Sequence, residues 1–468
     1  MTQPSPTPSQ PVDLVILGGG SGGYAAALRY AELGKNVVMV EMDKVGGTCL
    51  HRGCIPTKAL LHSAEVVDTI KDAASVGVIG SFDKVDLPGV NSYKDKVIEG
   101  LYKGLTGLVK SRKIEVVKGT GRLASPTSVE VALADGGSRT IEAAHVLLAT
   151  GSVPRSIPGL TIDHQRVITS DDALLLDGIP DSVIILGAGA IGCEFASVWR
   201  SFGAEVTIVE GLPHLVPLEE ESSSKLLERA FRKRGIKQEL GSRFQSATPT
   251  EGGISVTLEN GTVLEAELLL VAIGRGPVSA GLGYEEAGVV LDRGFVQVDD
   301  YCQTAVPTVS AVGDLIPTLQ LAHVGFAEGI LVAERLAGLP VTPVDYDGVP
   351  RVTYSHPEVA SVGITTKTAA ERGLETVEAI YDLAGNGRAR ILGTSGAVKV
   401  IAQKDGPVIG IHMVGERVGD LVAEAQLITN WEALPGEVAQ LIHPHPTMSE
   451  AVGEAHLALA GKPLHSHA

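Results

Sequence analysis

The chain contains the same pattern twice, and this repeat restricts the possible fold more than any other feature. LVILGGGSGGYAAALRYAELGKNVVMVEM spans residues 14–42, and VIILGAGAIGCEFASVWRSFGAEVTIVEG spans residues 183–211. Each copy has an apolar run, the pattern G-x-G-x-x-G, a helical stretch, and a second apolar run that ends in glutamate. This glutamate, Glu41 or Glu210, follows the first glycine by 23 positions in both copies. The pattern predicts two β–α–β units built on buried parallel strands.

The glycines of each copy predict a dinucleotide site. The first glycine allows a tight turn, the second lets the backbone approach a pyrophosphate, and the third lets the helix pack on the strand. Free N–H groups at the helix N-terminus hold phosphates, and the glutamate can accept hydrogen bonds from a ribose. One copy alone could be a glycine-rich turn of another α/β fold. Two complete copies indicate electron transfer between two dinucleotides, with NAD favoured over NADP because the acid repels a 2′-phosphate.

Length and composition exclude several classes of protein. The 468 residues suit two or three domains, and 44 % hydrophobic with 20 % charged residues is typical of a globular protein. The formal net charge of −17 argues against nucleic-acid binding. No apolar run reaches about 18 residues, so we expect no membrane span. Residues 1–11 are polar and proline-rich and predict a disordered tail without a signal peptide. Together with only four cysteines, this favours a cytoplasmic location.

A close cysteine pair follows the first repeat. In GGTCLHRGCIPTKALLHSAEVV, Cys49 and Cys54 precede a helical stretch over residues 55–67, with Pro56 acceptable in its first turn. Cys54 is therefore expected near a helix N-terminus, where a thiolate is stabilised, and Lys58 adds positive charge. A zinc pair would need two further ligands at finger spacing, and inert buried thiols are a second alternative. The favoured interpretation is a reversible disulfide beside the first dinucleotide site.

Near the end of the chain, HPHPTMSEAV offers an acid–base pair. Dithiol oxidation needs a base, and a histidine oriented by a carboxylate has a suitable pKa. His445 and Glu450, five positions apart, fit these roles. The alternative is that His443 and His445 are metal ligands or solvated loop residues, although no metal site is expected.

GGTCLHRGCIPTKALL resembles the redox-disulfide signature of the class I pyridine nucleotide–disulfide oxidoreductases, and the resemblance runs from about residue 12 to about residue 459. It implies that the first glycine motif binds FAD and the second binds NAD. It further implies that Cys54 faces the flavin and Cys49 exchanges with substrate. Lys58 would lie near the flavin and pair with Glu194, which follows the second glycine motif.

Four further stretches fit this family: ATG, VAIGRGP, TVSAVGDL and LAHVGFAEG. With the glycine motifs they complete the cofactor-binding residues that the resemblance implies. For FAD these are Gly18, Gly20, Gly23, Glu41, Thr48, Lys58, Thr150, Gly151, Asp314, Leu321, Ala322 and His323. For NAD they are Gly187, Gly189, Ile191, Gly192, Glu194, Glu210, Gly274 and Arg275.

The resemblance also implies the architecture: an α/β fold with two Rossmann-like dinucleotide-binding domains and a C-terminal α+β dimerisation domain. After the N-terminal tail we expect the first part of the FAD domain at 12–151, the NAD domain at 152–276, the second FAD or central part at 277–349, and the dimerisation domain at 350–468. In the family, the histidine immediately before Pro-Thr, here His445, reaches the disulfide of the other subunit. A homodimer is therefore expected.

Within the family the chain most resembles the dihydrolipoamide dehydrogenases. Glutathione reductases would carry arginines after the second strand, where this chain has VEGLPHLVP, and mercuric and large thioredoxin reductases carry a C-terminal redox pair that is absent here. Soluble transhydrogenases lack the first redox cysteine. One departure is the His51-Arg52 pair between the cysteines. The expected partners are the lipoyl domain and the peripheral-subunit-binding region of the acyltransferase of a 2-oxoacid dehydrogenase complex, or else the glycine cleavage system. Alternatives are another disulfide reductase or an NADH oxidase on this scaffold, or a non-catalytic flavoprotein subunit.

Overall fold

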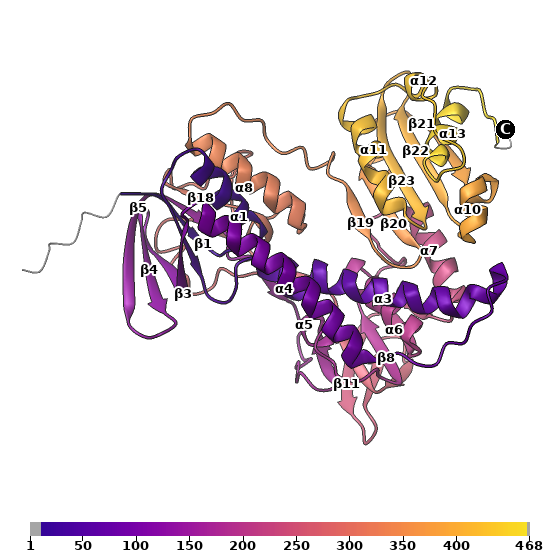
Figure 1. The fold of residues 1–468 in the computed structure, drawn as a ribbon, viewed down its shortest axis with the longest axis horizontal. Helices are drawn as coiled ribbons and strands as arrows, with labels where there is room; N and C mark the ends of the chain where they lie inside the picture. Colours follow the sequence, from indigo (N-terminus) through magenta and orange to yellow (C-terminus); the bar gives the residue numbers. More distant parts are fainter. Residues whose placement is uncertain (1–10, 466–468) are drawn as a thin grey trace, which may run out of the picture. The chain divides into compact units, whose positions relative to one another are not determined.

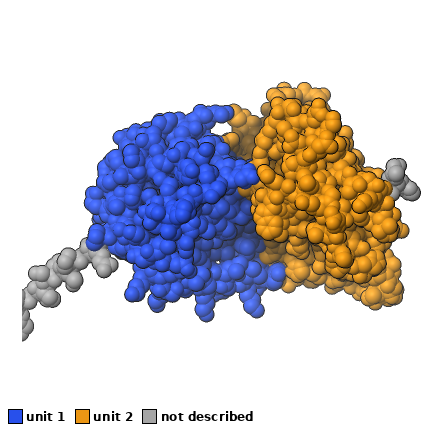
Figure 2. Space-filling model, turned by 90° about the horizontal axis from the view of Figure 1, so that it is seen from above, with its two compact units in different colours: residues 1–56, 92–154, 275–346 blue, residues 57–91, 155–274, 347–468 orange. Residues whose placement is uncertain are grey.

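The computed structural model of the chain describes residues 11–465 and forms two compact units, coloured separately in Figure 2. Unit 1 combines the residues up to Pro56 with 92–154 and 275–346, and unit 2 combines 57–91 with 155–274 and the residues from Asp347 onward. Apart from Pro11, the tail expected at residues 1–11 lies outside the described residues.

Unit 1 is built around a parallel sheet with strand order β3-β2-β1-β5-β18 (Figure 1). β4 joins β3 and β5 as an antiparallel meander. The helices α1 and α8 lie side by side, because a Cβ on Gly329 of α8 would come within 2.3 Å of the Gly22 carbonyl oxygen on α1. The elements are β1 (Val12–Leu17), α1 (Ser21–Glu32), β2 (Val37–Glu41), α2 (Gly47–Arg52), β3 (Glu115–Ser125), β4 (Ser128–Leu133), β5 (Ser138–Leu148), β6 (Ser152–Pro154), β15 (Arg275–Pro277), β16 (Leu291–Asp292), β17 (Phe295–Val296), β18 (Val309–Ala311), η2 (Gly313–Leu315) and α8 (Ala322–Leu336).

Unit 2 contains a second parallel sheet in the equivalent order, β10-β9-β8-β14-β7. It also has an antiparallel meander, β11-β12-β13. The first two strands of each repeat pair in the same register, Leu14 with Val37 and Val183 with Val206. The repeat in the sequence is therefore a repeat of a whole folding unit. Its elements are β7 (Val167–Thr169), α5 (Ser170–Ala173), β8 (Ser182–Leu186), α6 (Ala190–Phe202), β9 (Glu205–Glu210), α7 (Glu221–Lys233), β10 (Lys237–Leu240), β11 (Phe244–Pro249), β12 (Ile254–Leu258), β13 (Val263–Ala266) and β14 (Leu268–Val271).

The C-terminal part of unit 2 is an antiparallel sheet with the order β19-β20-β23-β22-β21. The helix α11 packs against β20 and β23, and α13 packs against β21 and β22. The elements are β19 (Arg351–Thr353), β20 (Glu358–Gly363), α9 (Thr366–Glu371), β21 (Thr376–Asp382), η3 (Leu383–Gly385), α10 (Gly387–Leu392), β22 (Ala397–Gln403), β23 (Val408–Gly415), α11 (Val418–Asn430), α12 (Pro435–Val438) and α13 (Glu450–Leu459).

The compact units differ from the expected division in two respects. Residues 57–91 pack in unit 2, although the FAD domain was expected to run unbroken over 12–151. The cause is apolar, since α3 (Cys54–Asp72) buries Leu60, Ala64 and Val67 in the same core as α6. The nucleotide-binding and C-terminal parts of unit 2 also form one compact body. Residues 57–91 also contain η1 (Ala73–Val76) and the start of α4 (Leu87–Ser111), whose residues from Ser92 onward belong to unit 1. Within residues 11–465, no helix is both long and apolar enough to span a membrane.

Candidate active site

The first and third glycines of each motif are required by the protein itself. Gly18 has φ +100°, and a Cβ there would lie 2.3 Å from the Ala149 carbonyl oxygen. A Cβ on Gly23 would lie 2.0 Å from the Gly18 carbonyl oxygen. The second copy repeats both features, with φ +103° at Gly187 and a contact of 2.0 Å for Gly192. These positions therefore make the tight turn and the close helix–strand packing that the sequence predicted.

The middle glycine of each motif has a different explanation. Gly20 and Gly189 are the N-caps of α1 and α6, with ordinary extended backbone angles and no side-chain cap. Among the residues that the structure describes, a Cβ on Gly189 would meet no atom within 4 Å, and one on Gly20 would meet only the Gly47 Cα at 4.0 Å. Neither the backbone nor the packing requires glycine here, so the requirement must come from a group outside the chain. Uncapped N–H groups at both helix N-termini fit the pyrophosphates of two dinucleotides. In the second copy, Ile191 lies in this first turn.

The terminal glutamates are held in the same way in both copies. Glu41 accepts hydrogen bonds from the backbone N–H of Gly19 and of Asp43, each at 2.7 Å. Glu210 accepts from the N–H groups at the same two offsets, each at 2.9 Å. Each carboxylate oxygen keeps a further lone pair. The carboxylates are thus fixed at the ends of β2 and β9, where they could receive the hydroxyls of an adenosine ribose.

The cysteine pair lies against the first glycine motif. Cys49 belongs to α2 and Cys54 begins α3, and both side chains are half-buried. A Cβ on Gly47 would lie 2.6 Å from the Cα of Gly20, so α2 touches the predicted FAD turn. The backbone also folds back between the cysteines, because a Cβ on Gly53 would lie 3.4 Å from the Cα of Cys49. The same Cβ on Gly53 would lie 3.1 Å from the carbonyl oxygen of Thr48, a residue that was predicted to bind FAD. The expected helix N-terminus at Cys54 is confirmed.

Tyr24 is a neighbour of the cysteines that sequence reasoning missed. Burial raises the pKa of Tyr24 to about 12, with further contributions from Cys49 and Cys54. Its ring lies 5.5 Å from that of Phe326 on α8. Its position directly after the third glycine of the motif was the available signal.

A chain of polar contacts connects two other predicted residues. Oδ2 of Asp314 accepts a hydrogen bond of 2.5 Å from the Ser152 hydroxyl, which in turn accepts one of 2.8 Å from Nε of Arg275. Arg275 was expected to bind NAD, but it lies in unit 1 with Asp314, whereas the second glycine motif and Gly274 lie in unit 2. Within unit 1, Arg275 is therefore linked to a predicted FAD residue, and its role toward NAD stays a prediction. Two further residues of this unit that were predicted to bind FAD are Thr150, whose hydroxyl donates to the Val278 carbonyl at 2.6 Å, and Gly151, with φ +71°.

Behind Asp314 lies a buried carboxyl group that sequence reasoning missed. Glu328 of α8 is fully buried and accepts hydrogen bonds from the Gly313 N–H (2.6 Å), the Thr318 hydroxyl (2.9 Å) and the Tyr346 hydroxyl (3.0 Å). Burial raises the pKa of Glu328 to about 7, against the effect of these donors. Glu328 therefore holds the turn that presents Asp314. The predicted FAD residues Leu321, Ala322 and His323 form the N-terminal end of the same helix.

Lys58 and Glu194 form the predicted ion pair. Nζ of Lys58 lies 2.8 and 2.9 Å from the two carboxylate oxygens of Glu194, whose side chain is only 5 % exposed. Glu194 also accepts a hydrogen bond of 3.0 Å from the Tyr354 N–H, and Nζ lies 4.7 Å from the centre of the Tyr354 ring. The pairing is confirmed, while the placement of Lys58 near the flavin stays a prediction because Lys58 belongs to unit 2.

The predicted acid–base pair is formed in the C-terminal part. Nδ1 of His445 lies 2.8 Å from Oε1 of Glu450, and the Thr447 N–H donates to Oε2 at 2.8 Å. Burial alone would raise the pKa of Glu450, but these two contacts lower it below its ordinary value. His443 instead pairs with Glu424 at 2.7 Å, a contact that sequence reasoning missed. Among residues 11–465, no group of three or more His, Cys, Asp or Glu side chains is placed to hold a metal ion.

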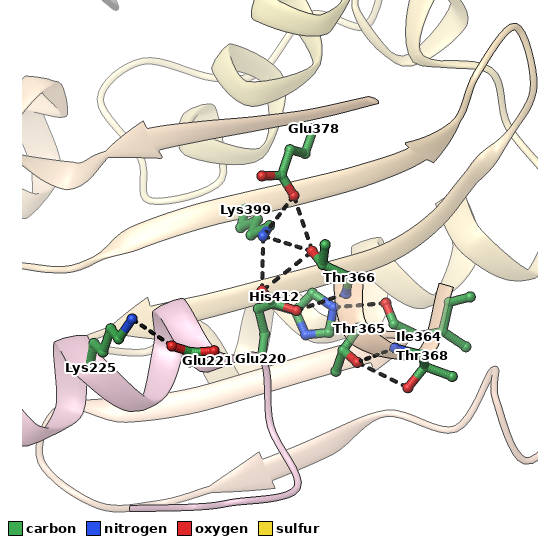
Figure 3. Close-up of polar contacts among 10 residues, drawn as sticks. All are labelled: Glu220, Glu221, Lys225, Ile364, Thr365, Thr366, Thr368, Glu378, Lys399 and His412. Atoms are coloured by element: carbon green, nitrogen blue, oxygen red, sulfur yellow. Dashed lines mark hydrogen bonds and ion pairs between the residues drawn. The ribbon is translucent and has the colours of Figure 1, made fainter. Parts of the chain in front are cut away.

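The loop that follows Glu210 ends in a buried ion pair, shown in Figure 3. Lys399 of β22 is 7 % exposed and lies 2.8 Å from Glu220, 2.7 Å from Glu378 and 2.8 Å from the Thr366 hydroxyl. Glu220 also accepts a hydrogen bond of 2.9 Å from the Thr366 N–H. This ion pair ties the second nucleotide-binding sheet to the C-terminal sheet within unit 2.

Comparison with known proteins agrees with this geometry. Residues 12–329 match the family model described as pyridine nucleotide-disulphide oxidoreductase, and residues 349–456 match its dimerisation domain. The chain belongs to the pyridine nucleotide-disulphide oxidoreductase family. It is 41 % identical to the dihydrolipoyl dehydrogenase of Bacillus subtilis over 97 % of this chain and 99 % of that one. It is 39 % identical to the mitochondrial dihydrolipoyl dehydrogenase of Pisum sativum, over 97 % of this chain and 92 % of that one.

A solved structure extends the family comparison to three dimensions. LpdA from Mycobacterium tuberculosis superposes with a TM-score of 0.89 at 29 % identity, covering 96 % of this chain and 99 % of that one. The expected family and the α/β fold with a C-terminal dimerisation domain are thereby confirmed. The same matches confirm an NAD-dependent flavoprotein disulfide oxidoreductase that uses FAD and NAD. The individual site residues stay assigned by motif and geometry.

Proposed function

We propose that the chain is a dihydrolipoyl dehydrogenase, which oxidises protein-bound dihydrolipoamide and reduces NAD⁺ to NADH. The observation that carries the proposal is the contact between the cysteine-bearing α2 and the Gly20 turn, which joins a dithiol exchange site to a dinucleotide site within one unit. The two relatives reported above bear this enzyme's name at 39–41 % identity over 97 % of the chain.

The reaction divides the work between the two cysteines. A thiolate of dihydrolipoamide attacks the sulfur of Cys49 in the Cys49–Cys54 disulfide and leaves Cys54 as a thiolate. The second substrate thiolate then attacks the substrate sulfur of the mixed disulfide, which closes the lipoamide ring and releases Cys49 as a thiolate. When bound, FAD would supply the two-electron acceptor through which the two thiolates return to the disulfide and the electrons reach NAD⁺.

His445 is assigned the role of base. Its Nδ1 faces Glu450 at 2.8 Å, so Nε2 is the nitrogen that takes a proton from the substrate thiol. The ionised carboxylate fixes this tautomer and stabilises the imidazolium that forms. The His445 side chain is 75 % exposed, so it is open to a substrate or to a second subunit.

We propose that the active form is a homodimer in which the partner's base serves this chain's cysteines. The matched dimerisation domain supports this assembly. Large apolar side chains are also exposed just before the base in the sequence, namely Trp431 at 77 %, Leu441 at 59 % and Ile442 at 97 %. A second copy that covered them would bring His445 into the same interface.

Two further proposals concern partners and location. The dithiol substrate is expected on a lipoyl domain of a 2-oxoacid dehydrogenase or glycine cleavage complex. In a 2-oxoacid dehydrogenase complex, docking is expected through the peripheral-subunit-binding region of the acyltransferase. We place the enzyme in the cytoplasm because a cysteine pair that cycles between states needs a compartment where structural disulfides are rare.

The test is turnover of dihydrolipoamide with NAD⁺ by the FAD-loaded enzyme and by C49S. C49S should bind FAD normally and lose dihydrolipoamide oxidation. C302S is the matched control, because Cys302 is buried in the core of unit 1 and has no assigned chemistry, so its turnover should match the wild type. Normal turnover of dihydrolipoamide by C49S would refute the disulfide mechanism. NADH oxidation that needs no dithiol would favour the oxidase alternative.

A further inference from the structure

A second histidine–glutamate pair lies two residues before the proposed base. Nε2 of His443 is 2.7 Å from Oε1 of Glu424 on α11, and the His443 side chain is 12 % exposed, against 75 % for His445. The hydrogen bond to Glu424 raises the pKa of His443 above its ordinary value, against the effect of burial, and Glu450 adds to the rise. The interior pair therefore favours an imidazolium at His443.

The ring of His443 also packs directly on α13. A Cβ on Gly453 would lie 2.6 Å from Nδ1 and 2.8 Å from Cε1 of His443. Glycine inside a helix costs about 1 kcal/mol relative to alanine, and Gly453 is not in a left-handed conformation that would require glycine. The ring of His443 is thus the feature that excludes a side chain at this position, which lies about one turn beyond Glu450.

The segment between His443 and α13 is held at both ends. At its start, His443 is fixed between Glu424 and Gly453. At its end, the Thr447 N–H donates to Glu450 at 2.8 Å, and the Thr447 hydroxyl donates to the Pro444 carbonyl at 2.7 Å. His445 lies between the two anchors, so its approach to Glu450 depends on both.

We propose that His443 is a positioning residue for proton transfer by His445. Held between Glu424 and Gly453, it fixes the short segment that brings Nδ1 of His445 to Glu450. This role rests on the proposed function, in which His445 is the base.

The groups that face His443 are few among the described residues. Glu424 comes from α11, and Glu450 and His456 come from α13. His456 is fully buried, its Nε2 has no hydrogen-bond partner within residues 11–465, and burial lowers its pKa. Burial therefore favours the neutral form of His456, whereas the hydrogen bond to Glu424 favours the protonated form of His443.

The test compares H443Q, E424Q and the double variant in the FAD-loaded enzyme. Each single variant should lower kcat for dihydrolipoamide oxidation about tenfold or more, because a misplaced catalytic group costs one to two orders of magnitude. The kcat of the double variant should be no lower than that of the single variants, because the two residues act as one unit. Reduction of the flavin by NADH, which does not use the base, should stay at the wild-type rate. In H443Q the pKa in the kcat profile should also move upward, because a nearby cation is lost.

A second pair of variants covers the case in which H443Q does not fold. G453A places a methyl group against the His443 ring and should reproduce the loss, whereas G436A, where a Cβ would meet nothing within 4 Å, should behave as wild type. The proposal would be overturned if H443Q kept the wild-type kcat and pH profile. It would also be overturned if H443Q slowed dihydrolipoamide oxidation and the reduction of the flavin by NADH to the same extent.

An NMR titration of labelled histidines separates this proposal from the proposed function. The positioning role predicts that the E424Q change lowers the pKa of His443 and shifts the His445 signals, whether or not the enzyme accepts dihydrolipoamide. Unchanged His445 signals would refute it. Absence of dihydrolipoamide turnover in the wild type would instead refute the proposed function alone.

Discussion

Replacing Gly189 by alanine tests the argument that a cofactor, and not the protein, requires the middle glycine of each motif. The new Cβ would meet no protein atom within 4 Å, and the backbone angles of φ −70° and ψ −174° suit alanine. Losing glycine at an N-cap costs up to about 1 kcal/mol, and the reduced freedom of the unfolded chain returns about 0.4–1 kcal/mol. The free energy of unfolding should therefore change by less than about 1 kcal/mol.

The effect on NAD⁺ should be much larger. A methyl group where the pyrophosphate approaches the helix N-terminus forces the phosphates away from the N–H groups. We expect G189A to weaken NAD⁺ binding by about 10- to 100-fold, or about 1.4–2.8 kcal/mol. The affinity for FAD, which we assign to the first copy of the motif, should not change.

The matched control is G192A, in which the Cβ would lie 2.0 Å from the Gly187 carbonyl oxygen. The backbone must move to accommodate it, so G192A should lose about 1–3 kcal/mol of unfolding free energy or more. Urea unfolding and the Kd for NAD⁺, measured on both variants, separate the two effects. Wild-type NAD⁺ affinity in G189A would show that NAD⁺ does not require glycine at this position.

Two further predictions concern buried charges. The pKa of Glu328 is raised from 4.5 to about 7, so the folded state keeps a proton that the unfolded state loses, and stability falls as the pH rises from about 4.5 through 7. At 1.36 kcal/mol per pKa unit, the full loss of stability is about 3 kcal/mol. E328Q should remove most of this pH dependence. If urea unfolding at pH 5 and pH 8 gave the same change in stability for the wild type and for E328Q, the prediction would be contradicted. E194Q removes the partner of Lys58 and should lower the free energy of unfolding by up to about 3 kcal/mol. The K58M/E194Q double variant should recover part of that loss, and an equal or greater loss would show that the charge pair is not the cause.

The sequence predicted the features that are encoded locally. The turns at Gly18 and Gly187, the glutamates at the ends of β2 and β9, and the approach of His445 to Glu450 each depend on residues at short, fixed spacing. Both glycine motifs and both glutamates therefore lie where the repeat placed them.

Lys58 and Glu194 are 136 positions apart, and their pairing followed from the family resemblance and not from spacing.

The features that were missed depend on contacts between distant segments. Glu220 and Lys399 are 179 positions apart, and neither lies in a motif. His443 and Glu424 are 19 positions apart on separate elements, so only the packing of α11 against the loop shows the pair. Glu328 lies within the LAHVGFAEG stretch, but its burial and its three donors come from the fold. Likewise, no pattern in residues 57–91 indicates that they pack with the second sheet.

The most direct test of the central claim, that the cysteine pair exchanges electrons with the bound flavin, is an anaerobic titration with dihydrolipoamide followed by the visible spectrum. If the pair exchanges electrons with the flavin, the first two electrons should leave the flavin oxidised and produce a long-wavelength charge-transfer band from the Cys54 thiolate, and added NAD⁺ should reverse the change. Bleaching of the flavin by the first two electrons with no such band, or no spectral change at all, would contradict it.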